Sequence, residues 1–223
     1  WNKSKKIYIS FISKYVRYFR HTRELVEDNS EKNPITEYAK TKWQAEKELN
    51  KLNSKNFTVV MLRPSTVFGV SPRLRCDIVF NNLVASAYTT KKIEIKSDGS
   101  PWRPVIHVKD VCSAIIACLK APTDIISGQV FNVGLKNGNY TVKELALAAQ
   151  KAVPGSSLVF TNEHKDDPRT YKVSFEKIYK ILGEYYKPKW TLEMGANELI
   201  EFFSSINFRE EDFRGYKTNR LVA

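Results

Sequence analysis

The chain has 223 residues, 42% of them hydrophobic and 27% charged, which is ordinary for a globular protein able to bury a substantial core. A formal net charge of +12 could indicate binding to a polyanion such as nucleic acid. The lysines, however, are scattered along the chain and not gathered in a run, so we expect no nucleic-acid partner. There is no bilayer-spanning apolar run, no signal peptide and no metal-ligand spacing among the three cysteines; we therefore expect a cytoplasmic protein with reduced thiols, no membrane partner and no metal.

The first half of the chain predicts a strand, a long helix and a second strand. Residues 6–10 read as a short buried strand, and residues 11–32 show no clean period and read as a loop. Asn33 suits an N-cap and Pro34 a first helical residue, so a helix is expected from there to about Leu52. Residues 57–63 are almost continuously apolar, as in a parallel strand covered on both faces, and a loop over residues 64–73 follows.

The second half continues the alternation. The patterns predict strands at residues 92–95, 105–108, 129–134 and 157–161, and helices at residues 77–87, 110–119, 141–153, 174–182 and 193–206. Thr141 and Glu144 have the spacing of a capping box at the head of one of these helices. Strands that alternate with helices predict an α/β fold with a mainly parallel sheet.

The long helix carries a tyrosine and a lysine one turn apart, Tyr38 and Lys42. Ala45, Leu49 and Leu52 continue the same face, and we expect these three to be core. A phenol titrates near ~10, too high for a base at neutral pH, and a neighbouring ammonium favours the phenolate. The pair therefore suits proton transfer to or from an alcohol or ketone. The alternative is that Tyr38 only packs and Lys42 extends into solvent.

Five segments, in order, resemble the extended short-chain dehydrogenase/reductase family, in particular its nucleotide-sugar epimerases and dehydratases. The segments are NPITEYAKTKWQAEK, LRPSTVFGVSPR, DGSPWRPVIHVKDVCSAI, FNVG and DPRTYKVSFEKIYKILG, and the resemblance as a whole runs from about residue 6 to about residue 206. The resemblance implies the C-terminal portion of a Rossmann-type doubly wound parallel sheet plus a smaller mixed α/β substrate-binding region. The Rossmann part would comprise residues 1–69 and 105–134, and the substrate region residues 70–104 and 135–223.

The resemblance also implies roles for single residues. Tyr38 would be the acid/base, and Lys42 would bind the nicotinamide ribose of NAD, with NADP left open. The residues expected against the nicotinamide are Pro64, Ser65, Thr66 and Val67, and those expected on the nucleotide-sugar substrate are Arg73, Arg103 and Arg169. Arg169 could equally be a surface arginine paired with Asp166 or Asp167. In this family a homodimer is common, and we expect one.

Two further residues of the third segment invite a role. His107 lies in a predicted strand without a partner constellation, so we interpret it as a structural histidine rather than a catalytic one. Asp110 lies near the head of the following helix, and we interpret it as a helix cap.

Two departures from the family pattern bear on function. The glycine-rich phosphate loop is absent; at ~30 residues per βαβ unit, roughly a hundred residues would precede Trp1, and we expect this chain by itself to bind NAD poorly. The family's Ser or Thr, four residues before a Tyr-Gly, is out of register here, so either Ser10 or Ser13 would serve as the catalytic hydroxyl.

The same stretch helps to choose a reaction. Sugar 4,6-dehydratases of the family carry an Asp-Glu pair beside that hydroxyl, where this chain has Ile12 and Ser13. An NAD-dependent nucleotide-sugar epimerase, working by transient oxidation to a keto-sugar and re-reduction, is therefore the first hypothesis. The alternatives are a dehydratase or reductase of the same superfamily, or a non-catalytic binding protein that keeps the fold.

Overall fold

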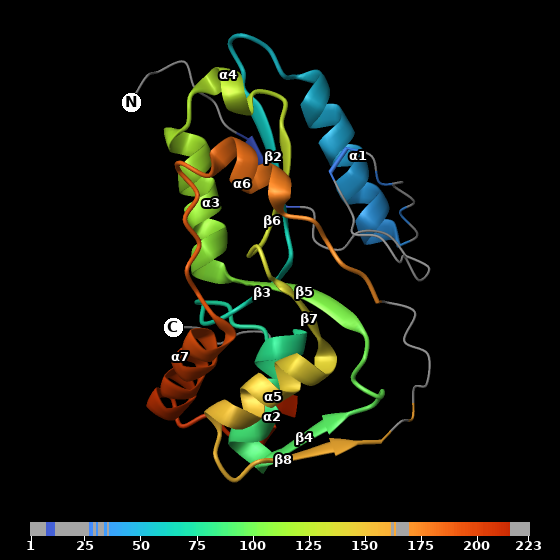
Figure 1. Cartoon of the computed structure of the whole chain (residues 1–223), viewed down its shortest axis with the longest axis vertical. Helices are drawn as coiled ribbons and strands as arrows, with labels where there is room; N and C mark the ends of the chain where they lie inside the picture. Colours follow the sequence, from blue (N-terminus) through green and yellow to red (C-terminus); the bar gives the residue numbers. More distant parts are fainter. Residues whose placement is uncertain are drawn as a thin grey trace.

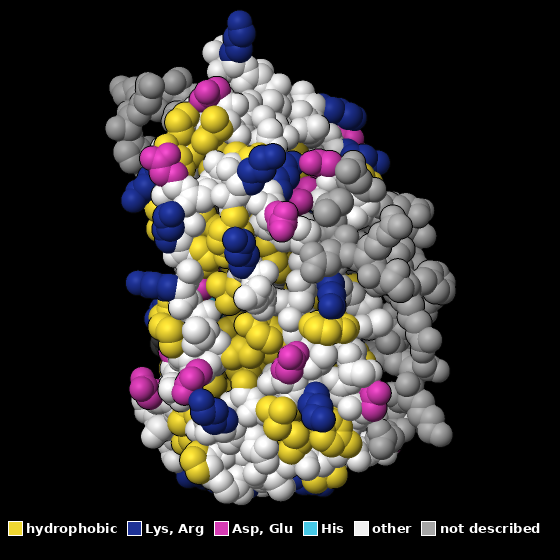
Figure 2. Space-filling model, in the orientation of Figure 1, with side chains coloured by type: hydrophobic (Ala, Val, Ile, Leu, Met, Phe, Trp, Pro, Cys, Tyr) yellow, Lys and Arg dark blue, Asp and Glu magenta, His cyan; other side chains and the backbone are white. Residues whose placement is uncertain are grey.

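The computed structural model describes residues 8–11, 27–28, 30, 34, 36–161, 163 and 170–214. Over these residues strands and helices alternate, and most strand pairs are parallel, which confirms the predicted α/β class (Figure 1). Lys and Arg side chains are interleaved with Asp and Glu over the face seen in Figure 2. Among the described helices, none combines the length and the apolar character needed to cross a membrane.

The upper sheet in Figure 1 has the strand order β1-β2-β6, all parallel, with β1 at Tyr8–Phe11, β2 at Val59–Pro64 and β6 at Val130–Val133. Every residue of β2 is buried, as expected for a parallel strand with helices on both faces. Val60 and Leu62 pack into one hydrophobic cluster with helices α3 (Val108–Lys120) and α6 (Glu176–Leu182). Arg63 faces the opposite side, where helix α1 (Glu37–Lys51) lies.

Helix α1 begins and faces differently from the prediction. Its N-cap is Thr36, whose hydroxyl accepts from the backbone N–H of Ala39 at 3.2 Å, so the prediction of Asn33 as the cap is wrong. The predicted core face is also wrong: Ala45 is exposed, Leu49 is only half-buried, and Leu52 is 56% exposed. The two buried residues are Ala39 and Glu46. The buried face is displaced by one residue because the Glu46 carboxylate pairs with Arg63 beneath it.

The lower region contains two further small sheets and the helices that pack on them (Figure 1). One sheet has the order β3-β5-β7, formed by Thr66–Phe68, Trp102–His107 and Asn139–Thr141; β3 and β5 are parallel, β5 and β7 antiparallel. The other pairs β4 (Lys92–Ile95) with β8 (Ser157–Phe160) in parallel. Helices α2 (Val79–Thr90), α5 (Val142–Ala152) and α7 (Leu192–Ser205) cover a second hydrophobic cluster.

Local capping signals account for several element ends. Thr141 and Glu144 form the predicted capping box: the Thr141 hydroxyl accepts from the Glu144 N–H at 3.1 Å, and the Glu144 carboxylate accepts from the Thr141 N–H at 2.6 Å. The prediction of a continuous loop after Pro64 is wrong, because Thr66–Phe68 form β3 beside β5. Strand β7 and the short helices α4 (Thr123–Ile126) and α8 (Glu210–Arg214) were not anticipated.

The two hydrophobic clusters differ in which parts of the chain they draw together. The upper cluster combines β2, β6 and α3 with residues 173–186, which return to it from late in the chain. The lower cluster combines β4, β5, α2, α5 and α7. The division of the chain into a Rossmann part and a substrate region, with the boundaries given above, stays a prediction.

Candidate functional site

Tyr38 and Lys42 lie on the first two turns of α1 and stay together. The Lys42 Nζ is 5.7 Å from the centroid of the Tyr38 ring, and the tyrosine is 50% exposed. Within the described part of the chain neither the phenol nor the ammonium makes a hydrogen bond or ion pair, whereas Lys40 pairs with Glu37 at 2.7 Å. A donor and an acid/base group are thus both available to a ligand at the amino end of α1.

The loop between β3 and α2 carries two arginines, Arg73 and Arg75. In it, Arg75 pairs with Asp77 through two hydrogen bonds of 3.0 and 2.6 Å. The pKa of Arg75 is raised, chiefly by the hydrogen bond to Asp77 and to a lesser degree by electrostatic interactions with Asp77 and Tyr38. Tyr38 therefore lies within electrostatic reach of this loop. Arg73, predicted to bind substrate, is exposed on the same loop, while Arg75 was missed by sequence reasoning although it stands two residues further on.

The four residues predicted to contact the nicotinamide turn the corner from β2 into β3. Pro64 is buried at the end of β2, and the Ser65 N–H donates to the Val133 carbonyl at 3.0 Å. The Ser65 Oγ is buried and has no hydrogen-bond partner in the described residues, although buried hydroxyls nearly always have one. Thr66 and Val67 are half-buried in β3. This corner therefore holds one unused polar atom.

Thr66 and Arg103 come together through a residue that sequence reasoning missed, Tyr171. The Tyr171 phenol hydrogen-bonds the Thr66 side chain and interacts with the charge of Arg103. Burial raises the pKa of Tyr171, and the guanidinium and the Thr66 hydrogen bond partly oppose that rise. Arg103 itself is half-buried, and its Nη1 donates to the Trp102 carbonyl at 2.8 Å. Arg103 is therefore anchored close to the β2–β3 corner.

For three of the predicted site residues the structure describes the backbone alone or nothing. Ser10 belongs to β1, where its backbone is in register with Met61. Ser13 and Arg169, together with the proposed partners of Arg169, lie outside the described residues.

A buried ion pair, also missed by sequence reasoning, joins α1 to β2. Arg63 donates through Nε to Glu46 Oε2 at 3.0 Å and through Nη2 to Glu46 Oε1, and both side chains are almost fully buried. Burial lowers the pKa of Arg63 to about 10. The available signals were an arginine ending the apolar run of residues 57–63 and a glutamate four residues after Lys42.

His107 is fully buried, as a structural histidine is, where α3 meets α7. Its ring stacks on Trp190 with centroids 4.0 Å apart, and its Nε2 lies 2.8 Å from a carboxylate oxygen of Glu198. Its Nδ1 accepts from the Lys109 N–H at 3.2 Å, so the proton of the neutral ring is on Nε2. Burial lowers the pKa of His107, against the opposing effect of Glu198.

The interpretation of Asp110 as a helix cap is wrong. The N-cap of α3 is His107, and Asp110 lies within the helix, where its carboxylate accepts from the backbone N–H groups of Lys189 and Trp190 at 3.0 and 2.9 Å. Asp110 therefore holds the segment of Trp190 in the position where the indole stacks on His107. It does not cap the start of its own helix.

Three solved structures share the fold of this chain. UDP-glucose 4-epimerase of Thermotoga maritima, solved with UDP-glucose, has a TM-score of 0.73 at 21% identity over 92% of this chain and 64% of that one. UDP-glucuronic acid 4-epimerase of Bacillus cereus, solved with UDP-glucuronic acid and NAD, has a TM-score of 0.70 at 22% identity over 91% and 62%. dTDP-glucose 4,6-dehydratase of Bacillus anthracis, solved with NAD, gives 0.70 at 22% over 92% and 62%.

Sequence comparison gives the family. Among curated proteins, the low-salt glycan biosynthesis protein Agl12 of Haloferax volcanii is 28% identical in an alignment of 138 positions that covers 59% of this chain and 41% of Agl12. The chain thus spans less than two thirds of the length of these relatives. The model of the NAD dependent epimerase/dehydratase family matches residues 16–134, just over half of the chain. The chain belongs to the NAD-dependent epimerase/dehydratase family.

Proposed function

We propose that the protein is an NAD-dependent epimerase that acts on a nucleotide sugar through transient oxidation to a keto-sugar and re-reduction. The observation that carries the proposal is the uncommitted pair of Tyr38 and Lys42 at the amino end of α1. The family of the chain supports the reaction class, and its solved structural relatives include epimerases crystallised with UDP-sugars and with NAD.

The residues around the pair fit a nicotinamide dinucleotide, which would supply the hydride acceptor and donor. Lys42 offers three donors with no partner of their own in the described chain, enough to hold ribose hydroxyls. Ser65 offers a buried hydroxyl that lacks a partner, and a polar group of a bound nicotinamide would satisfy it. The amino end of α1 and the carboxyl end of β2 lie at about the same height of the molecule (Figure 1). In this proposal the nicotinamide is held between them.

Each side chain has a defined task in this proposal. The Tyr38 phenolate takes the proton of the sugar hydroxyl as it becomes a ketone, and returns it on re-reduction. The Lys42 ammonium stabilises that phenolate through space. The arginines Arg73 and Arg103 supply positive charge for the pyrophosphate, for which a guanidinium fork is well suited.

Dehydration is the second candidate, because a dTDP-glucose 4,6-dehydratase matches the fold as well as an epimerase does. Elimination of water needs an additional acid and base. At the position where such enzymes carry an Asp-Glu pair, this sequence has Ile12 and Ser13, neither of which is a carboxylate. That difference favours epimerisation.

Product analysis decides between the two. The whole protein, supplied with NAD, is incubated with a panel of UDP- and dTDP-hexoses, and the products are identified by NMR. An epimerase yields a sugar inverted at one carbon with no change in mass, and a dehydratase yields a 4-keto-6-deoxy sugar lighter by one water. Absence of turnover with every sugar would contradict both and favour a non-catalytic binding protein.

Cofactor binding by the 223-residue chain alone tests the expectation drawn from the absent glycine-rich loop. Without a helix amino terminus to receive the pyrophosphate, NAD is expected to bind more weakly than roughly millimolar, as measured by isothermal titration calorimetry. Binding in the micromolar range would show that the described residues hold the dinucleotide unaided.

A further inference from the structure

We propose that the buried pair of Arg63 and Glu46 is the positioning device of the proposed active site, setting the helix that carries Tyr38 and Lys42 against the β2–β3 corner. The inference rests on the proposed function. Arg63 is two residues before Ser65, and Glu46 is one helical turn after Lys42. A single contact therefore links both halves of the site.

The geometry of the Arg63–Glu46 pair fixes the relative orientation of the two side chains as well as the distance between them. Two nitrogens of the guanidinium meet two oxygens of the carboxylate, through Nε with Oε2 at 3.0 Å and Nη2 with Oε1. A planar bidentate contact constrains the rotation of each partner as well as their separation. Because rotation of α1 about its own axis decides where Tyr38 and Lys42 point, this contact sets the direction of both side chains.

The same guanidinium reaches a third segment. Its Nη1 donates to the Glu27 carbonyl at 3.1 Å, and the Glu27 carboxylate accepts from the backbone N–H of Asn132 at 2.8 Å. Asn132 is the register partner of Arg63 on the neighbouring strand β6. Arg63 therefore holds α1, Glu27 and the sheet in one arrangement.

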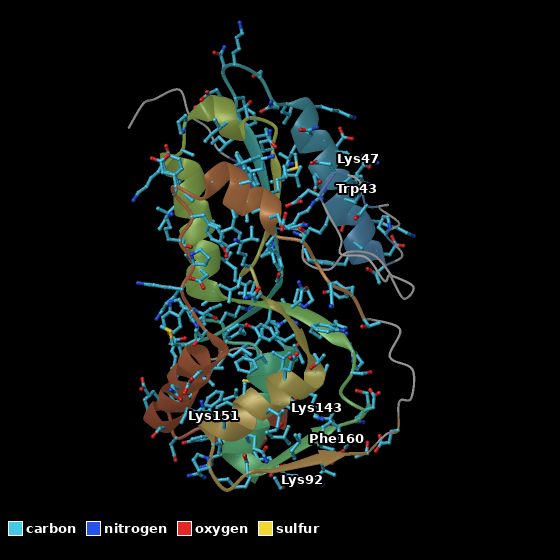
Figure 3. The ribbon with its side chains drawn as sticks, viewed as in Figure 1. Trp43, Lys47, Lys92, Lys143, Lys151 and Phe160 are labelled. Atoms are coloured by element: carbon cyan, nitrogen blue, oxygen red, sulfur yellow. The ribbon has the colours of Figure 1, made fainter. Side chains whose placement is uncertain are left out.

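Little else on α1 can perform this task. Only Ala39 and Glu46 of the helix are buried, and Ala39 has no side chain able to define a rotation. Trp43, labelled on α1 in Figure 3, packs with its ring centroid 5.9 Å from the Arg63 guanidinium and so depends on the same anchor. A buried ion pair is in general weak evidence for stability and better attested as a device that fixes register.

Two variants of the whole protein test the proposal. Arg63→Lys keeps a charge beside Glu46 but loses the fork, and the double variant Arg63→Met with Glu46→Met removes both charges at similar volume. Lys47→Gln, at an exposed position next to Glu46, is the matched control (Figure 3). We expect kcat to fall about 10- to 100-fold in Arg63→Lys and in the double variant, with KM for the sugar changed less than about threefold, because misplacement of the acid/base by about 1 Å costs that much.

Amide hydrogen exchange gives a readout that does not need turnover. In both variants, exchange should accelerate at least about tenfold at residues 38–42 and 65–66 together, and stay unchanged in α5 and in the Lys47→Gln control. Exchange that is unchanged at both segments, or that accelerates equally throughout the chain, would overturn the proposal, as would a kcat within threefold of the unsubstituted protein. If no nucleotide sugar is turned over, the proposed function fails on its own, and the exchange pattern still decides whether the pair positions the helix.

Discussion

The contact between α1 and β2 and the contact between α3 and α7 both bury polar side chains, but the first buries opposite charges and the second a neutral ring. In the first, Arg63 and Glu46 meet through a bidentate ion pair. In the second, His107 stacks on Trp190 and hydrogen-bonds Glu198 at its edge. The charged contact lies beneath an exposed helix that carries the proposed chemistry, and the neutral contact holds α7 against the rest of the molecule.

The difference shows how burial is adapted to two tasks. Aromatic stacking tolerates small slides of one element over another, since its energy varies gently with offset. A buried ion pair tolerates them poorly, because an imperfectly paired charge in the interior is costly. The neutral contact is therefore suited to cohesion and the charged contact to alignment.

Removing one charge of the ion pair should give the largest effect on stability. Arg63→Met leaves the Glu46 carboxylate buried without its partner, and we expect the free energy of unfolding to fall by about 3–5 kcal/mol. The double variant Arg63→Met with Glu46→Met should lose far less, because no charge stays behind. Urea denaturation monitored by circular dichroism measures both. Equal destabilisation of the single and double variants would mean that the pair acts as packing volume only.

Tyr38→Phe should separate chemistry from stability on the same helix. The phenol is half-exposed and makes no hydrogen bond in the described structure, so the unfolding transition should stay within about 0.5 kcal/mol of the original. Turnover of the nucleotide sugar by the whole protein should fall about 10²- to 10⁴-fold, the usual contribution of a general acid/base. Steady-state kinetics with Tyr88→Phe, a substitution on the lower-region helix α2, is the matched control. Unchanged turnover in Tyr38→Phe would remove its assigned role.

Gly69→Ala tests how tightly the neutral contact is packed. Gly69 has φ +106°, and a Cβ there would collide with the His107 imidazole. Strain and overpacking together should cost about 3 kcal/mol in the free energy of unfolding. Gly155→Ala is the control: its φ is +80° but no atom lies within 4 Å of a Cβ, so only the backbone strain of about 1 kcal/mol is expected. Equal losses of unfolding free energy in the two variants would show that the His107 side chain can move aside for the new Cβ at no cost.

The smallest expected effect is the pH dependence of the α3–α7 contact. Burial lowers the pKa of His107 below its ordinary 6.5, so the unfolded chain binds a proton more readily than the folded protein does. The stability contributed by His107 is thus fully present above about pH 6.5 and is lost as the pH falls from there through the lowered value. Thermal unfolding between pH 8 and 5 should show this loss in the original protein and a shallower one in His107→Gln. A steeper slope in the variant would contradict the assignment.

Local signals made much of the fold predictable. The apolar composition of residues 57–63 predicted a buried parallel strand. The three-residue spacing of Thr141 and Glu144 predicted a capping box. Both depend on neighbours in the chain. The alternation of strands and helices followed from such signals, and the family comparison agrees with the resemblance found in the motifs.

Contacts between distant residues limited what the sequence could predict about the site. Glu46 looks like a solvent-facing residue on a helix, and its burial follows from a partner 17 positions away. Because the burial of Glu46 was not foreseen, the predicted core face of α1 was wrong by one residue. Asp110 has the position of a cap, yet its partners are the N–H groups near residue 190. The roles assigned to Tyr38, Lys42 and the residues after β2 stay predictions.

The Ser65 hydroxyl has no hydrogen-bond partner among the described residues, and this brings stability and the proposed cofactor binding into conflict. A buried hydroxyl without a hydrogen-bond partner generally costs about 1–3 kcal/mol, because its dehydration is not offset by another hydrogen bond. If Ser65 contacts the nicotinamide as proposed, Ser65→Ala should raise the free energy of unfolding and weaken the binding of the dinucleotide. A screen for heat resistance alone would therefore tend to remove a hydroxyl that is proposed to contact the cofactor.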